Sequence, residues 1–234
     1  MYDQLFKCRP QHFAVAVNTL LTTITCSFVG MTYASETASF ADQCQEMAMK
    51  SKFSIAFEDV QLVRDNTRNL DELRRLSQLT PSPYHFVYGL TRAQAKAEYE
   101  IHPVMLTGAD GSICATPSIS VKIGLSELTV YLAKELINPC KRAAVDDHEQ
   151  EHVNTWRSHL RAGTRLLEPV LRRSLMRPFY FTRADEVQPG LKRQIDAVLG
   201  PLLDNLQKGI TANHGEIDSP YSYRLTAQRL GACP

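Results

Sequence analysis

The chain has 234 residues, of which 44% are hydrophobic and 22% are charged, as in an ordinary globular protein. Its formal net charge is +1, so no strongly basic surface indicates nucleic acid as a partner. It contains no Gly-rich phosphate loop and no G-x-S-x-G sequence, so it lacks these signs of a nucleotide-binding protein or a serine hydrolase.

The first 34 residues have the layout of a secretory signal peptide. Lys7 and Arg9 precede a mostly apolar run over residues 13–29, and the sequence Thr-Tyr-Ala at 32–34 suits cleavage after Ala34. An uncleaved membrane anchor is the alternative, but Asn18 and several threonines make the run a poor spanning helix. We therefore expect a secreted or periplasmic protein with one domain over residues 35–234 and no stable membrane span after cleavage.

Removal of this segment leaves four of the six cysteines, namely Cys44, Cys114, Cys140 and Cys233. An even number in an exported chain predicts two disulfides, for which three pairings are possible. We favour Cys114–Cys140, which would flank one β segment, and Cys44–Cys233, which would tie the two ends together. Free buried thiols are the alternative for a cytosolic chain.

The first half of the mature chain carries mainly strand signals. Residues 52–63 alternate apolar and polar side chains like a half-buried strand, whereas residues 69–79 have helical spacing. Thr91 is expected to cap a short helix over residues 91–99. From residue 98 to residue 133 the pattern predicts an antiparallel β meander with an Asp-Gly turn at 108–111.

The second half is helical. A long stretch over residues 141–175 places His148, His152 and His159 on one side, and Gly163 or Pro169 is expected to bend or end it. Residues 184–212 form a second amphipathic stretch, and a short helix ends the chain. Strands followed by helices indicate an α+β fold.

Residues 148–152 read His-Glu-Gln-Glu-His, the H-E-x-x-H pattern of zinc hydrolases. Four residues make about one helical turn, so His148 and His152 project from the same face and can bind one Zn²⁺. Glu149 would lie beside the open coordination position as the general base. Because Glu151 and its neighbours make this stretch unusually charged, a solvated helix face with two surface histidines is the alternative.

A catalytic zinc normally has a third protein ligand, and the sequence offers several. His159 lies seven residues beyond His152, about 10 Å along a continuous helix, which is too far to share the ion. Glu168 could bind if the chain reversed near Gly163, although pairing with Arg165 or Arg172 is the simpler interpretation.

Two later residues are further candidates for the third ligand. His214 stands beside Gly215 at an expected turn, where its ring could point into a cleft. Asp218 offers a carboxylate oxygen, but its place before Ser-Pro is more typical of a turn or a helix cap.

Residues 120–160 resemble the exported bacterial family of secreted zinc-dependent proteases, which are zincin-like and carry H-E-x-x-H. The shared features are a late β strand at 129–133, Cys140 before the motif, Val153 after it, and a later His-Gly pair matched by His214 and Gly215. The resemblance supports a zincin-like domain, in which the predicted antiparallel β meander is followed by the active-site helix and further helices. It also favours His214 over Glu168 as the third zinc ligand.

We therefore expect an exported zinc-dependent metallopeptidase that hydrolyses peptide or protein substrates, with Glu149 as the general base. His159, Tyr221 and Tyr223 are candidate donors to the oxyanion. The main alternative is a non-catalytic exported binding or scaffold domain with a vestigial or structural metal site. A zinc hydrolase of another amide, such as a cell-wall peptide crosslink, would use the same coordination chemistry.

Overall fold

The computed structural model describes residues 38–77 and 87–234, and Ala38–Pro234 forms one compact unit. The predicted signal peptide over residues 1–34 lies outside the described residues and stays a prediction. In chain order the elements are α1 (Phe40–Met49), β1 (Phe53–Glu58), β2 (Val63–Asp65), α2 (Leu70–Ser77), β3 (Gly89–Thr107), β4 (Ile113–Leu132), α3 (Pro139–Leu175), β5 (Phe179–Phe181), the 3-10 turn Ala184–Glu186, α4 (Val187–Ile217) and α5 (Pro220–Gly231).

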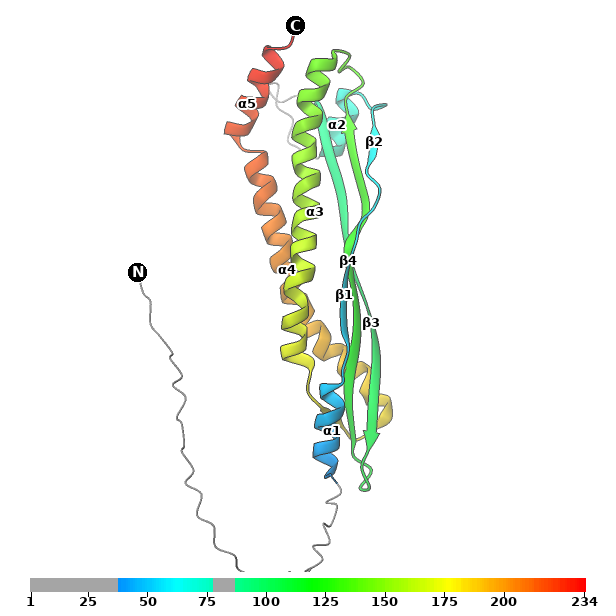
Figure 1. The fold of residues 1–234 in the computed structure, drawn as a ribbon. Helices are drawn as coiled ribbons and strands as arrows, with labels where there is room; N and C mark the ends of the chain where they lie inside the picture. The colour runs from blue at the N-terminus through cyan, green and yellow to red at the C-terminus, as the bar shows by residue number, and fades with distance from the viewer. Residues whose placement is uncertain (1–37, 78–86) are drawn as a thin grey trace, which may run out of the picture. The chain divides into compact units, whose positions relative to one another are not determined.

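One mixed sheet forms one layer of this unit, with β4 as its central strand (Figure 1). β3 pairs antiparallel with β4 from end to end, and β5 pairs antiparallel with the first residues of β4. β1 and β2 pair with β4 in parallel. The predicted α+β fold with an antiparallel meander is therefore wrong, because the sheet is mixed and the fold combines it with helices as an α/β arrangement.

The meander fails because only one of its expected turns forms. The Asp-Gly turn is confirmed: Gly111 has a φ of 83°, and Asp110 accepts hydrogen bonds from the backbone N–H and the hydroxyl of Ser112. Beyond it, residues 113–132 run as one strand of 20 residues. At Gly124 a Cβ would lie 1.9 Å from the carbonyl oxygen of Glu58, so the missing side chain lets β1 approach β4 closely.

The predicted short helix after Thr91 is also wrong, because these residues belong to the 19-residue strand β3. Alanine favours helices, but Ala93, Ala95 and Ala97 alternate with polar residues at the period of a strand. Continuous pairing with β4 outweighs the local helix preference. The predicted strand within residues 52–63 and the predicted helix near residues 69–79 are confirmed as β1 and α2.

α3 and α4 pack together and cover one face of the sheet (Figure 1). Leu160 and Leu167 of α3, Ile195 and Ile210 of α4 and alternate residues of β4 form the buried core. α3 continues for 37 residues through Gly163 and Pro169, so the helix does not end at either residue. Within the described ranges, no helix is long and apolar enough to cross a membrane.

The prediction of two disulfides is confirmed, but both favoured pairings are wrong. Cys44 of α1 bonds to Cys114 of β4, and Cys140 of α3 bonds to Cys233 at the end of the chain. Cys114 and Cys140 could not pair because most of β4 separates them. Eighteen residues of extended strand span about 60 Å, whereas the Cα atoms of a disulfide lie within about 7 Å.

Candidate metal centre

The first four turns of α3 carry the two histidines of the H-E-x-x-H sequence. Asn138 caps this helix by accepting a hydrogen bond from the backbone N–H of Lys141, and Pro139 occupies its first turn. His148 and His152 lie on one face with ring centroids 5.2 Å apart, as their spacing predicts. Each side chain is only 10% exposed, which contradicts the alternative of two surface histidines.

The charged neighbours of the motif have partners away from the two histidines. Arg64 of β2 donates hydrogen bonds to Asp146 and Gln150, and Arg229 of α5 pairs with Asp147. Glu151 is exposed. The unusual charge of this stretch therefore belongs to the outer faces of α3 and does not fill the space between the histidine rings.

Asp218, which follows the last residue of α4, brings a carboxylate to both histidines. Its Oδ1 lies 3.4 Å from Nε2 of His148 and 3.2 Å from Nε2 of His152. Burial opposes ionisation of this carboxyl group, but the hydrogen bonds with the two histidines outweigh burial and lower its pKa. The hydrogen bond with Asp218 in turn raises the pKa of His148, against the opposing effect of burial.

Two of the three distances between these atoms match a tetrahedral zinc site. Four ligands at about 2.0–2.1 Å from zinc lie about 3.3–3.4 Å from one another. The two Nε2–Oδ1 distances are 3.4 and 3.2 Å, and all three ligand atoms lie within 4.8 Å of one another. Two imidazoles and one carboxylate are also a donor set that zinc accepts, with a fourth position left for a water or a substrate. The residues present therefore fit the predicted Zn²⁺.

His214, the predicted third ligand, lies in the same site but on the other side of His152. Its Nδ1 is 2.8 Å from Nδ1 of His152, so a hydrogen bond joins the two rings. Burial lowers the pKa of His214 to about 4, and the nearby His152 acts in the same direction. A neutral His214 can accept the Nδ1 proton of His152, which leaves Nε2 of His152 as the nitrogen with a free lone pair.

α3 and α4 thus each present a pair of polar side chains one turn apart. His148 and His152 face His214 and Asp218, because α4 continues through Gly215 to Ile217 instead of turning at the His-Gly pair. The spacing of four between His214 and Asp218 is the sequence signal that could have identified Asp218. The sequence predicts turns at His214 and Asp218, so their helical spacing was not used.

Glu149, the predicted general base, is held by the first residues of β3. The hydroxyl of Thr91 lies 2.8 Å from Oε2 of Glu149, and a Cβ at Gly89 would lie 2.6 Å from its Oε1. The side chain is buried, and burial raises its pKa. Sequence reasoning missed Thr91 and Gly89, because it placed Thr91 in a helix and nothing local to residue 91 indicates a partner 58 residues later.

The three candidate oxyanion donors have different surroundings. Tyr223 of α5 donates its hydroxyl hydrogen bond to Oδ1 of Asp218 at 3.0 Å, and its ring centroid is 5.8 Å from that of His148. Burial and the charge of Asp218 both raise the pKa of Tyr223. Tyr221 is 64% exposed, and His159 is bonded to Asn213 at 2.7 Å. Only Tyr223 of the three contacts the candidate metal centre.

Glu168, the alternative third ligand, lies outside the site. It accepts a hydrogen bond of 2.9 Å from Arg172 one turn later. Sixteen residues of continuous helix place it about 24 Å along the axis from His152. The reversal near Gly163 that would have brought it back does not occur.

Comparison of the chain with known protein families, with curated proteins and with solved structures found no match.

Proposed function

We propose that the chain is an exported zinc metallopeptidase in which His148, His152 and Asp218 hold the metal. The observation that supports this most directly is the spacing of the three ligand atoms, 3.2 and 3.4 Å between each Nε2 and the shared Oδ1. A bound zinc ion would polarise the scissile carbonyl group and lower the pKa of water at its open position to about 7.

Glu149 is the general base of this proposal. It follows His148 directly in α3 and interacts electrostatically with both histidines and with Asp218. Burial raises its pKa and so makes the carboxylate a stronger base, which can accept a proton from the attacking water and then pass it to the leaving amine. Thr91 fixes Oε2 of this carboxylate, which orients the side chain.

A polypeptide is the substrate class that the sheet favours. In the part of the chain that the structure describes, β3 has β4 on one edge and no strand on the other. Its first residues, which include Thr91, lie at the proposed active site. An unpaired strand edge can bind an extended peptide through main-chain hydrogen bonds. The two disulfides agree with the proposed secreted or periplasmic location.

The proposed ligand set is tested by a matched pair of single variants, Asp218→Ala and His214→Ala. If Asp218 binds the metal, its loss should abolish stoichiometric zinc binding. His214→Ala should weaken zinc binding by only about 10–100-fold, as is typical for a residue that orients a ligand. Competition with a chromogenic chelator measures the zinc affinity of both variants. A larger loss of affinity in His214→Ala than in Asp218→Ala would assign the third ligand to His214.

The alternative of a non-catalytic domain has one observation in its favour. The two histidines, Asp218 and Tyr223 form hydrogen bonds among themselves and therefore do not require an ion to satisfy them. Glu149→Gln separates the two functions, because it should preserve zinc binding and abolish peptide hydrolysis. Wild-type protein that binds zinc but cleaves nothing in a broad peptide library would favour the binding domain.

A further inference from the structure

The last segment of the chain carries Asp218 and Tyr223 but has little packing of its own. Ile210 is the last buried residue of α4, and no residue from 211 to 234 is buried. Leu230 packs partly against the core, and Arg229 pairs with Asp147 at the surface. Exposed ion pairs contribute little to stability, so apart from its hydrogen bonds to His152 and His159 at and near the candidate metal centre the segment is held weakly.

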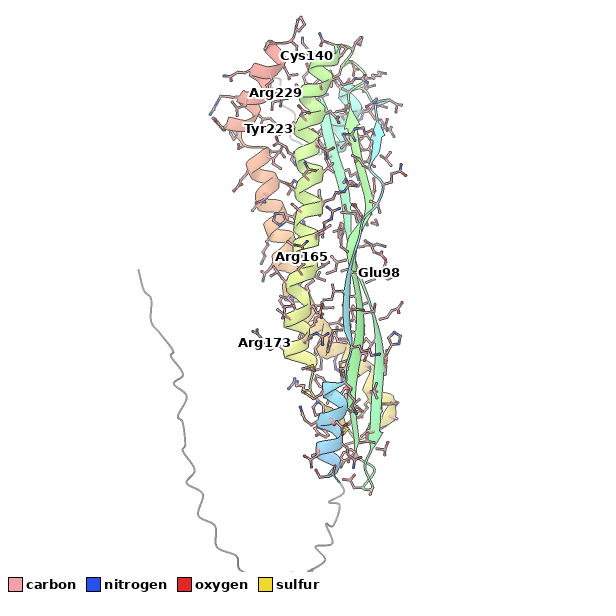
Figure 2. The ribbon with its side chains drawn as sticks, viewed as in Figure 1. Glu98, Cys140, Arg165, Arg173, Tyr223 and Arg229 are labelled. Atoms are coloured by element: carbon pink, nitrogen blue, oxygen red, sulfur yellow. A yellow bond between two sulfur atoms is a disulfide. The ribbon has the colours of Figure 1, made fainter. Side chains whose placement is uncertain are left out.

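One covalent bond joins this segment to the helix that carries the histidines. Cys140 lies in the first turn of α3, eight residues before His148, and bonds to Cys233 after the end of α5. Figure 2 shows Cys140, Arg229 and Tyr223 near the end of α3 at which the chain begins this helix and beside which α5 lies. Close to this bond, the side-chain amide of Asn138 donates a hydrogen bond of 2.6 Å to the carbonyl oxygen of Pro234.

The two disulfides differ in exposure and in position. Cys44 and Cys114 are both 0% exposed and join α1 to the start of β4, and α1 lies at the opposite end of the unit from the start of α3 (Figure 1). Cys140 is exposed and Cys233 is half-buried. A reductant must reach a sulfur atom to react with it, so the Cys140–Cys233 bond is the one open to reduction in the folded protein.

We propose that the Cys140–Cys233 disulfide holds Asp218 against the two histidines and makes zinc binding depend on the oxidation of this cysteine pair. This inference rests on the proposed zinc site. A dithiol reductant would attack one sulfur, break the S–S bond and form a mixed disulfide, which its second thiol then resolves. The protein gains two electrons and two protons as two thiols, and the dithiol becomes a disulfide.

Reduction frees residues 211–234 to move away from α3 and removes Asp218 from the ligand set. The histidine pair stays in place, because the core around Val153 and Leu160 holds α3. Two histidines alone bind zinc much more weakly than two histidines and a carboxylate. The chain would therefore acquire its zinc only in an oxidising compartment, and a reducing one would keep the proposed peptidase inactive.

The test compares the double variant Cys140→Ser/Cys233→Ser with the matched double variant Cys44→Ser/Cys114→Ser. Zinc affinity is measured by chelator competition, and hydrogen exchange of residues 211–234 is measured in metal-free protein. We expect the first variant to bind zinc at least tenfold more weakly and to exchange faster over this segment. In the second variant zinc affinity should stay within threefold of the wild type.

The Cys44→Ser/Cys114→Ser variant can fail to fold, because both cysteines are buried. In that case wild-type protein is treated with a phosphine reductant and alkylated, and its zinc affinity is compared with that of untreated protein. Mass spectrometry should then find Cys140 and Cys233 alkylated and Cys44 and Cys114 still bonded, with weakened zinc binding. Equal zinc affinity and equal exchange in wild type and the Cys140/Cys233 variant would overturn the inference and leave the proposed function standing. Wild-type protein without a zinc site would instead overturn the proposed function and the zinc dependence together, and exchange would still show whether the disulfide holds the segment.

Discussion

Thr91→Val tests whether the first residues of β3 hold the proposed general base. The substitution keeps the shape of the side chain and removes the hydroxyl that lies 2.8 Å from Oε2 of Glu149. Glu149 is only 5% exposed, so water cannot replace the lost hydrogen bond. An unsatisfied buried acceptor costs about 1–3 kcal/mol, which corresponds to a fall in Tm of roughly 2–12 °C for a chain of this size.

Denaturant unfolding of metal-free protein with intact disulfides measures this loss, and the chain supplies a matched control. Thr67→Val removes a similar bond, in which the hydroxyl of exposed Thr67 lies 2.6 Å from the carboxylate of Asp65. Water can satisfy Asp65, so this variant should change the unfolding free energy by only about 0.5 kcal/mol or less. Thr91→Ser should restore most of the lost stability. Equal, small losses in the two valine variants would refute the reasoning.

Three further results are expected. Gly89→Ala would place a Cβ 2.6 Å from Oε1 of Glu149 and 2.7 Å from Cγ1 of Val145, so we expect a loss of about 1–3 kcal/mol in unfolding free energy and a displaced base. Hydrolysis should fall while zinc affinity, measured by chelator competition, stays within a few-fold of the wild type. Zinc at 100 times its Kd should stabilise the protein by about 2.7 kcal/mol, and a chelator should remove this gain in a thermal scan. Glu168→Ala should leave zinc stoichiometry unchanged, and loss of the metal in this variant would contradict the position of Glu168 outside the site.

The local parts of the site could be predicted from the sequence, because helical periodicity acts over a few residues. The spacing of His148 and His152 places them on one face of α3, and Glu149 is fixed beside them because it is the next residue of the same helix. The helix itself was predicted from the same pattern. The third donor could not be assigned in this way, because Asp218 reaches the histidines only through the packing of α4 on α3.

The sheet was harder to predict because strand pairing is not local. Residues 113–132 contain Pro117, Gly124 and the polar residues 126–127, which read like breaks between short strands. β4 nevertheless runs through all of them, since β3 pairs with it throughout and β1 packs at Gly124. The predicted cysteine pairing was wrong because it assumed short strands. The long β4 separates Cys114 from Cys140, so each of them lies near a different cysteine.

The register of the β3–β4 hairpin decides whether the general base has its support. Gly89 pairs with Leu132 and Thr91 with Val130, which places both next to the short connection into α3 and therefore near Glu149. A slip of one residue would turn Thr91 to the opposite face of the sheet. The irregularity at Gln94/Ala95 adjusts this register: Gln94 pairs with residue 127 and Ala95 with residue 125, so Ser126 is an extra residue in β4.

This extra residue switches the phase of β4 part-way along the strand. Before it, Ile123 and Leu125 are the buried alternate residues, and after it Leu128 and Val130 are buried. β3 has no extra residue, so Thr91 stays on the face of β3 that pairs with these buried positions, toward α3. Because of the bulge at Ser126, β4 keeps buried residues along its whole length while the Thr91 hydroxyl still points toward Glu149. The pairing of the sheet therefore decides the position of the proposed general base.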